Sequence, residues 1–333
     1  MFSPLHSLIP TLSFALALAA QQTISSHPQD TPLDGSANVA PFGVLASGAA
    51  AESRVQILIP RDELPAPGAT LTGLELACLV GGTVRYGQLQ ITARPVTLTT
   101  LSTTFAANLA GPATQVLAAS SLQVNWATSA WTPLAFTQPY VHDGVSALLL
   151  DIVKVVVPAG GGSSFPFVTM SAAYPERTDR PQMVYVFGGP GSGAATLATA
   201  FAQAQPVSMR LRWSSAPTLR HRSDNNALLA YGLGNVVQFF VNATPGHLFA
   251  LAGGDAFLPA AVPVPGILGN LRLGAPILFA SGLINGVGAG GTQFTMPNVP
   301  SLVGLHLAYQ AATIDPATGS LSLTNGTDHF INP

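Results

Sequence analysis

The sequence predicts an all-β protein of two antiparallel β-sandwich or jelly-roll-like domains, with a Gly- and Pro-rich irregular insertion that carries one short helix. Its apolar runs are short, are dominated by Thr, Val, Leu and Phe, and are separated by turn residues, including many of the 33 Gly and 28 Pro. Amphipathic helical stretches are nearly absent, and regularly spaced short strands are typical of sandwiches and jelly rolls. The length of 333 residues corresponds to about two domains of roughly 150 residues each.

Charge is scarce throughout the chain. Only 8% of the residues are charged, compared with about a quarter in ordinary soluble domains. Twelve basic and fourteen acidic side chains are too few to form a nucleic-acid-binding stripe, a polybasic membrane patch or an acidic tail. The composition therefore excludes nucleic acid as a partner, while the 48% hydrophobic content is sufficient for a large core.

The N-terminal residues predict a secreted or cell-surface protein. Leu8–Ala20 is an apolar stretch of 13 residues, which is too short to cross a bilayer as a helix. It ends in small residues that fit cleavage after Ala19 or Ala20, so residues 1–20 are interpreted as a signal peptide. Residues 21–36 are polar, contain two prolines and are expected to form a disordered leader. Every later long apolar stretch contains a charge or a helix breaker, so no integral membrane segment is expected after signal removal.

Residues 37–222 are expected to form the first sandwich domain. Their clearest feature is a predicted hairpin, in which Leu71–Val80 and Val84–Ala93 are joined by a Gly81-Gly82 turn. Because Cys78 is the single cysteine, no intramolecular disulfide can form. Its thiol is expected to be buried. The predicted inner face comprises Leu74, Leu76, Cys78, Leu89 and Ile91, and the outer face comprises Glu75, Tyr86, Gln88 and Gln90.

Residues 158–205 interrupt the first domain as the Gly-rich, irregular insertion. Ala194–Ala204 (AATLATAFAQA) is the one segment with a helical pattern. It follows Gly189–Ala194, which matches the G-x-G-x-x-A spacing of a dinucleotide-binding turn. The acidic residue that would bind ribose about twenty positions later is missing. Residues 188–194 are therefore interpreted as a mobile surface loop, and no cofactor is predicted.

A polar break at His221–Asn226 marks the start of a second sandwich domain, residues 223–333. The break is followed by a new series of apolar runs, which ends with Leu302–Ala312 and Leu321–Thr324. A segment of this size can enclose one sandwich core. Residues 224–331 are therefore expected to fold without the rest of the chain.

The second domain carries a series of recognisable motifs. Pro300–Ala311 (PSLVGLHLAYQA) is followed by an Asp315-Pro316 turn and by Leu323–Asn325, with Thr244–Gly246 upstream. This series resembles the C-terminal domain of a group of uncharacterised secreted proteins from planctomycetes and related bacteria. The resemblance covers roughly residues 240–331 and implies a secreted, β-rich protein. It implies no activity, so no functional residue is carried over from it.

No sequence motif predicts catalysis or metal binding. None of the seven His forms a short ligand pair such as H-x-H, and no Ser lies in G-x-S-x-G. Acidic pairs such as Asp62-Glu63 fall in apparent turns and are expected in solvent, which does not favour the paired carboxylates of a glycosidase. Catalytic triads are spatial rather than sequential, so a hydrolase assembled from distant residues stays open. No catalytic, metal-binding or cofactor-binding residue is predicted.

One group of side chains indicates a ligand-binding surface. Arg210 and Arg212 alternate along a predicted strand and therefore project from one face, with Trp213 adjacent. Arginine and tryptophan together bind acidic glycans or protein surfaces. The alternative is a strand edge that solvated arginines protect from aggregation.

Two functions remain after these exclusions. The sequence favours a secreted, non-catalytic surface, matrix or adhesion protein, whose partner is an extracellular polysaccharide or another surface protein. The alternative is a secreted polymer hydrolase of the esterase or glycosidase type, with the second domain as an accessory. A Ser or carboxylate in a cleft beside His142, His221 or His247 would favour the hydrolase.

Overall fold

The computed structural model of the chain describes residues 22–27, 36–38, 40–44, 51–157, 167–170, 183–188, 190–198, 200–202, 207, 209–214, 216–223 and 232–331. Strands account for 62% of the structure, and no helix of seven or more residues occurs in these ranges, which confirms the predicted β-rich class. None of the helices in them is long and apolar enough to cross a membrane. The predicted signal peptide lies outside the described residues. In the described ranges, helical geometry is limited to the short 3-10 helices η1 (Arg61–Glu63), η2 (Phe105–Asn108), η3 (Ser192–Ala194) and η4 (Pro300–Leu302).

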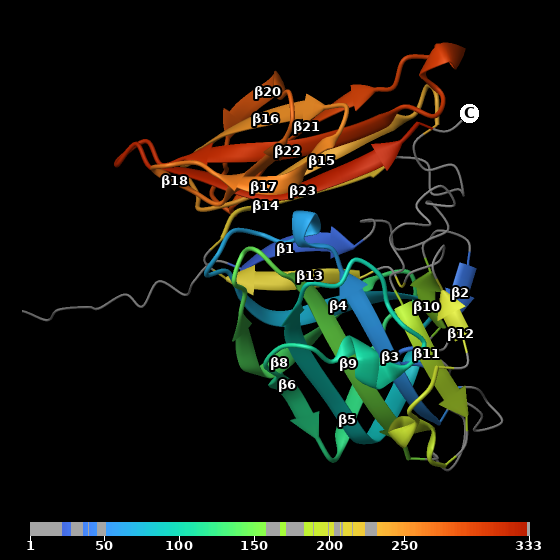
Figure 1. Cartoon of the computed structure of the whole chain (residues 1–333). Coiled ribbons are helices and arrows are strands. Elements are labelled where there is room, and N and C mark those ends of the chain that lie inside the picture. The colour runs from blue at the N-terminus through green and yellow to red at the C-terminus, as the bar shows by residue number, and fades with distance from the viewer. Residues whose placement is uncertain are drawn as a thin grey trace, which may run out of the picture.

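The strands gather in two lobes, which Figure 1 shows one above the other. We call strands β1 to β13 the N-terminal lobe and strands β14 to β23 the C-terminal lobe. One sheet of the N-terminal lobe has the order β1-β13-β4-β10-β2, with β8 also paired to β4. Its strands are β1 (Gln22–His27), β13 (Met209–Ser214), β4 (Thr70–Val80), β10 (Phe167–Met170), β2 (Ser36–Asn38) and β8 (Trp131–Val141).

The second sheet of the N-terminal lobe has the order β12-β11-β3-β9-β5-β6, with β7 also paired to β5. Its strands are β12 (Ala200–Ala202), β11 (Met183–Gly188), β3 (Glu52–Ile59), β9 (Ala147–Val156), β5 (Gly82–Val96), β6 (Thr114–Ala119) and β7 (Leu122–Trp126).

The C-terminal lobe is formed by three smaller sheets, with the orders β14-β15-β21, β18-β23-β22-β16-β20 and β17-β19. Neighbouring strands run antiparallel, except that β18 is parallel to β23. The strands are β14 (Thr218–Ser223), β15 (Val236–Asn242), β16 (Leu248–Gly254), β17 (Phe257–Pro263), β18 (Ile267–Leu268), β19 (Asn270–Leu273), β20 (Ile277–Leu283), β21 (Ala289–Thr295), β22 (His306–Ile314) and β23 (Leu321–Phe330).

The predicted hairpin is wrong, because β4 and β5 belong to different sheets. β4 pairs with β13, β8 and β10, whereas β5 pairs with β9, β6 and β7. The chain crosses between the sheets at Gly81, where an added Cβ would lie 2.4 Å from the carbonyl oxygen of Trp126. Close packing, rather than a hairpin turn, therefore requires glycine at this position. The predicted inner face is nevertheless buried in one core cluster, with all five members, Leu74, Leu76, Cys78, Leu89 and Ile91, fully enclosed.

Tyr86 is buried on the side of the core, although strict alternation places it on the outer face. The pairing of β5 with β9 shifts register between Tyr86 and Gln88, and such a bulge exchanges the faces of the residues on either side of it. The Tyr86 hydroxyl donates to the carbonyl of Phe42 at 2.8 Å and accepts from the indole N–H of Trp126 at 2.9 Å. The bulge thus brings a hydrogen-bonded aromatic group into the core.

β9 supplies the centre of the N-terminal lobe. Leu148, Leu150 and Ile152 on one face join the core cluster shared by both sheets, and Leu149 on the other face joins a second cluster. Lys154 occupies the next inward position and is fully buried, with its Nζ donating to the carbonyl of Gly43. Burial lowers the pKa of Lys154 from 10.5 to about 7, because a low-dielectric interior disfavours the charged form.

Two segments differ from the secondary structure that the sequence predicts. Within the expected disordered leader, residues 22–27 form β1, whose inward side chains Thr23, Ser25 and His27 are polar and buried. Polar inward residues hide the alternation that normally identifies a strand. Within the expected helix at residues 194–204, residues 200–202 form β12, paired with β11. The helix is replaced there because this edge of the sheet offers main-chain hydrogen bonds.

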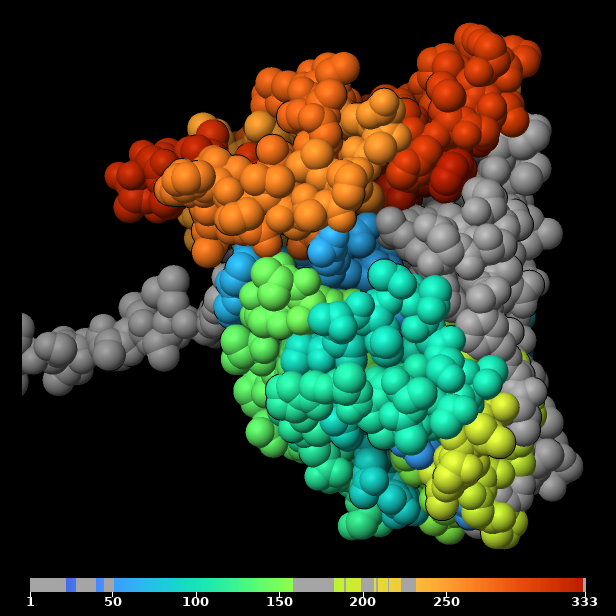
Figure 2. All heavy atoms as spheres, viewed as in Figure 1, coloured from blue at the N-terminus to red at the C-terminus, as the bar shows by residue number. Residues whose placement is uncertain are grey.

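The chain passes from the N-terminal to the C-terminal lobe between β13 and β14. The domain boundary predicted near residue 222 falls within β14, which pairs along its length with β15. The division into two independent domains remains a prediction. Figure 2 shows that the blue segment around η1 lies between the orange C-terminal lobe and the green N-terminal lobe, so the two lobes are packed together.

Candidate functional site

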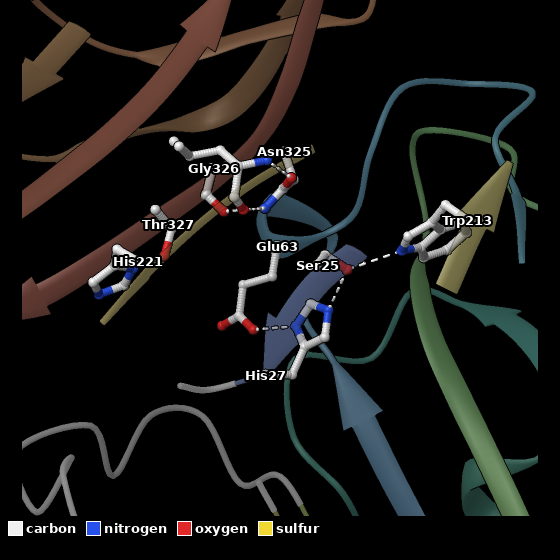
Figure 3. A network of polar contacts seen from close by, with 9 residues as sticks. Ser25, His27, Glu63, Trp213, His221, Asn325, Gly326 and Thr327 are labelled. Carbon is white, nitrogen blue, oxygen red and sulfur yellow. Dashed lines mark hydrogen bonds and ion pairs between the residues drawn. The ribbon is translucent and has the colours of Figure 1, made fainter. Parts of the chain in front are cut away.

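At the junction of the lobes, hydrogen bonds join β14 to β1 of the N-terminal lobe and to β23 of its own lobe. The Thr218 hydroxyl on β14 donates to the carbonyl of Ile24 on β1 at 2.7 Å. The Asn325 side chain on β23 accepts from the N–H of Leu219 and donates to the carbonyl of the same residue, both at 2.8 Å. The side-chain amide of Asn325 thus satisfies both main-chain groups of Leu219, as the backbone of an adjacent strand would. Figure 3 shows this amide above the polar groups of β1 and η1.

A buried chain of side chains connects β13, β1 and η1 (Figure 3). The Trp213 indole N–H donates to Ser25 Oγ at 2.8 Å, and Ser25 Oγ lies 2.9 Å from His27 Nε2. His27 Nδ1 in turn lies 2.8 Å from Glu63 Oε2. The order of groups is that of a Ser–His–acid triad, in which the acid orients the imidazole and the imidazole activates the hydroxyl.

The burial of these hydrogen-bonded side chains indicates that their role is structural. Ser25 is 0% exposed, so a substrate carbonyl cannot reach its Oγ, and the hydroxyl also accepts the Trp213 hydrogen bond. Glu63, which the sequence placed in solvent, is buried against His27 instead. No motif revealed the group, because Ser25 and His27 are two residues apart on one strand and the other members come from distant segments.

A cavity of about 530 Å³ lies between the lobes, beside η1. β3, η1, β5 and β9 supply its walls from the N-terminal lobe, and β17, β19 and β22 supply them from the C-terminal lobe. Its volume falls within the range of about 300–1,000 Å³ that is usual for small-molecule sites. The apolar lining includes Leu58, Val96, Leu98, Val145, Phe257 and Leu258.

Arg272 is fixed in the cavity wall by contacts from both lobes. Its backbone N–H donates to Gln310 Oε1 at 3.0 Å, which ties β19 to β22. Its Nη2 donates to the carbonyl of Leu64 at 3.1 Å, and Asn270 on the same strand donates to the carbonyl of Gly144 at 3.0 Å. The position of the guanidinium is therefore determined by the tertiary structure around it.

The Arg272 guanidinium is buried with its hydrogen-bonding capacity only partly used. The residue is 3% exposed, and among the described residues its Nε and Nη1 have no hydrogen-bond partner. Burial lowers the pKa of Arg272 to about 10, with the Asp62 carboxylate opposing this shift and the Arg61 guanidinium adding to it. The group stays charged at neutral pH. A buried charge is stable only where nearby charges and hydrogen bonds compensate its lost hydration.

Other polar groups face the same cavity. Arg61 lines it and donates from Nη2 to the carbonyl of Pro259, which connects η1 to β17. His306 lines it as well, and its Nε2 lies 2.6 Å from the buried Asp328 carboxylate. Within the described residues, the hydrogen bond of His306 is the one to Asp328. The imidazole is therefore not paired with a hydroxyl or a thiol.

The sequence did not identify Arg272, although one signal was present. Arg272 is the single Asp, Glu, Lys or Arg between Asp255 and Asp315. An isolated charge in a long uncharged stretch that forms strands is unusual, and buried charges mark functional sites more often than exposed ones do.

The predicted surface of Arg210, Arg212 and Trp213 requires a correction. Arg210 and Arg212 do share one face of β13, but both guanidinium groups are part-buried beside Glu75, at 3.5 and 3.7 Å. Trp213 is 0% exposed and lies in the core, because successive residues of β13 point to opposite faces and Trp213 shares the buried face with Leu211. The indole beside Arg210 is that of Trp131, whose ring centre is 4.3 Å from the guanidinium carbon.

None of the three histidines named for a hydrolase lines the cavity between the lobes or a second hollow on the C-terminal lobe. His142 is buried, and burial lowers its pKa to about 4, so its imidazole is neutral at physiological pH. His221 is buried and hydrogen-bonded to the Thr327 hydroxyl, while His247 is half-buried. The burial of His142 and of the His221–Thr327 pair leaves neither imidazole accessible to a substrate, and His247 lines neither hollow.

A second hollow of about 540 Å³ lies entirely on the C-terminal lobe. Its lining is apolar and aromatic and includes Ile277, Phe279, Phe294, Leu307 and Tyr309. The rings of Phe279, Phe294 and Tyr309 pack against Phe239. This hollow presents few hydrogen-bonding groups, so it is the less specific of the two.

Neither the Gly-rich loop nor the acidic residues form a candidate site in the described ranges. The Gly191 N–H donates to Glu52 Oε2 at 2.7 Å, and the three-residue η3 follows, so the loop does not open a long helix. Gly189 lies outside the described residues. Within the described ranges, no group of three or more His, Cys, Asp or Glu could hold a metal ion.

The chain matches no family model, and a comparison with curated proteins finds no match. The function proposed below therefore depends on the geometry of the site.

Proposed function

We propose that the chain is a non-catalytic binding protein of the cell surface or extracellular space, and that the cavity between its lobes is the ligand site. The observation that carries this proposal is how the cavity is built. Both lobes supply its walls, and it combines apolar side chains with a fixed, buried Arg272. Sites for small ligands have this combination and occur preferentially between domains.

The same proposal extends to the fold and the partner. Two sheets share one core cluster in the N-terminal lobe, which supports a sandwich or jelly-roll arrangement. The motifs of residues 240–331 support kinship with the secreted planctomycete proteins that they resemble. The ligand would then be an extracellular molecule, either free or a terminal group of a polysaccharide or surface protein.

Secretion is tested by N-terminal sequencing of the protein from culture medium. The mature chain is expected to begin at Ala20 or Gln21, directly before β1, which starts at Gln22. Because β1 pairs with β13, uncleaved material would keep the apolar stretch attached to the edge of a sheet. Exported protein that begins at Met1 would contradict the signal peptide.

A matched pair of variants tests the cavity as the binding site. Ala261 lines the cavity from β17, whereas its neighbour Ala260 is exposed and does not. Ligand-observed NMR with a panel of amino acids, sugars and aliphatic acids is expected to find binders in the wild type and in Ala260→Trp. The larger side chain in Ala261→Trp is expected to abolish their binding. Equal binding by both variants would place the site elsewhere.

A hydrolase is the second candidate, and the Ser25–His27–Glu63 chain is the observation that favours it. The test is hydrolysis of p-nitrophenyl esters by the wild type and by Ser25→Ala. Because Ser25 is fully enclosed, both proteins are expected to remain at the background rate. Ester hydrolysis that disappears in Ser25→Ala would replace the binding proposal with catalysis.

A further inference from the structure

The charges that face the cavity between the lobes are unequal. Arg61 and Asp62 reach it from η1 and Arg272 reaches it from β19. His306 reaches it from β22 and is held by Asp328 of β23. Two guanidinium groups therefore face one lining carboxylate, and the remaining polar pair joins a histidine to an acid. Among the Asp, Glu, Lys and Arg side chains that line the cavity, the guanidinium groups therefore exceed the carboxylates by one.

Of the two lining arginines, Arg272 is the one whose charge is less compensated by its surroundings. Arg61 is partly exposed, so water compensates its charge. Arg272 is 97% enclosed, and within the described residues two of its three guanidinium nitrogens lack a hydrogen-bond partner. In surroundings of low dielectric an opposite charge interacts with it far more strongly than in water. An anion in the cavity would supply the compensation that the described protein groups leave incomplete.

The rest of the lining selects the body of such a ligand. Leu58, Val96 and Phe257 are apolar and lie on walls from different strands. A strongly hydrated polyanion would lose its hydration against these side chains without recovering it. A single charge on an apolar body matches both parts of the lining.

We infer that the cavity binds a monoanionic carboxylate with an apolar body, whose charge is balanced by Arg272. This inference rests on the proposed function, since it names the ligand class of the same cavity. A carboxylate fits better than a phosphate because the lining guanidinium groups exceed the lining carboxylates by only one, and a phosphate ester brings close to two negative charges at neutral pH.

The experiment compares three probes that share one apolar chain: octanoate, octanamide and octyl phosphate. Calorimetric titration of the mature wild-type protein is expected to give octanoate an affinity about tenfold or more above octanamide, with octyl phosphate weaker than octanoate. Equal affinity for octanoate and octanamide would overturn the inference. Tighter binding of octyl phosphate would overturn the choice of a carboxylate.

Variants of arginine assign the charge to a residue. Arg272→Met is expected to reduce octanoate affinity to that of octanamide, whereas Arg210→Met, which alters a guanidinium outside the cavity, leaves it unchanged. Arg272→Lys keeps the charge and is expected to keep a measurable preference for octanoate, so it serves if Arg272→Met does not fold. An unchanged preference in a folded Arg272→Met protein would overturn the role of Arg272.

The Ala261→Trp variant separates this inference from the proposed function. If octanoate and octanamide bind equally and both are lost in Ala261→Trp, the cavity is the binding site and the anion inference is wrong. If neither probe binds, the anion inference is also wrong. The proposed function then depends on the wider panel of ligands.

Discussion

Two central strands, β9 and β23, are each buried on both faces, yet their sequences are opposite in character. β9 reads ALLLDIVKVV and packs Leu148 and Leu150 into one core cluster and Leu149 into another. β23 reads LSLTNGTDHF and is buried without interruption from Leu323 to His329. Its buried polar side chains are those of Thr324, Asn325, Thr327, Asp328 and His329.

The difference shows that the two strands are stabilised by burial in different ways. β9 is stabilised by removing apolar surface from water, which any close-packed neighbour provides. β23 is stabilised only where specific partners satisfy its polar groups, as Leu219 does for Asn325 and His306 does for Asp328. Its partners come from other elements, and β14, β19 and η1 all pack against it. A polar buried strand therefore marks the junction, where the candidate site also lies.

The largest expected effect comes from cutting the chain on either side of β14. The fragment 216–331 retains β14 and is expected to unfold cooperatively and to give dispersed amide signals by NMR. The fragment 224–331 lacks β14, which leaves Asn325 and the edge of β15 without their partners, so it is expected to remain unfolded. The longer fragment exposes β23 to water where the N-terminal lobe is missing. This exposure is expected to leave the fragment folded, because water can hydrogen-bond to the polar side chains of the strand.

Either of two outcomes would break this part of the comparison. Cooperative folding of 224–331 would show that β14 is dispensable and that the boundary predicted from the sequence is adequate. Random-coil amide shifts in 216–331 would show that both lobes share one folding unit.

Lys154 is the fully buried charged residue of β9, and its burial can be tested by varying the pH. Its pKa is lowered from 10.5 to about 7 by burial, so between these values the unfolded chain binds more protons than the folded one. The free energy of unfolding is therefore expected to rise with pH across this window, by up to about 1.4 kcal/mol per unit from this residue. Below pH 7 the contribution is constant.

Lys154→Met provides the comparison in urea unfolding at several pH values. The variant is expected to lack the rise seen in the wild type, because methionine fills the site without a charge. Parallel curves for the two proteins between pH 7 and 10.5 would show that Lys154 is not buried as described.

A truncation in the apolar strand is expected to have the next largest effect. Leu150 is fully buried in the main core, and Leu150→Ala is expected to lower the free energy of unfolding by about 4 kcal/mol through lost burial and a cavity. Leu283 is 60% exposed on the edge strand β20, so Leu283→Ala is the control and should change stability by less than about 1 kcal/mol. Similar values for both variants would contradict the position of β9 at the centre.

A truncation in the polar strand is expected to have a smaller effect. Asn325→Ala removes the partner of both main-chain groups of Leu219 and should lower the free energy of unfolding by about 2 kcal/mol. Asn298 is exposed, and Asn298→Ala is expected to change it by less than about 0.5 kcal/mol. An effect of Asn325→Ala no larger than that of the control would mean that these hydrogen bonds do not stabilise the packing of β23 against β14.

Part of the fold was predictable because alternation records which side chains face a core. Leu74, Leu76, Leu89 and Ile91 were assigned to the buried face, and each is fully enclosed. Their pairing could not be predicted, since a period of two residues identifies the buried side of a strand and not the strand beside it. The crossing at Gly81 illustrates this, because a tight packing contact and a hairpin turn both favour glycine.

The candidate site was less predictable than the core. The named surface of Arg210 and Arg212 is part-buried, and Trp213 faces the other way. Arg272 could have been noticed as an isolated charge, but its neighbours at the cavity come from six other elements spread over both lobes. No local pattern in the chain joins them.

By itself the sequence determined that this chain is β-rich and that apolar residues such as Leu74, Leu76, Leu89 and Ile91 are buried, since both follow from composition and local alternation. Only the tertiary structure decided that Gln22–His27 and the Asn325-Gly326 segment become buried strands. Asn-Gly is ordinarily a turn signal, yet here Asn325 satisfies Leu219, and Gly326 leaves room for the ring of Phe257. The physical reason is that polar residues can be buried only where distant segments supply their hydrogen bonds, and those partners exist only in the folded chain.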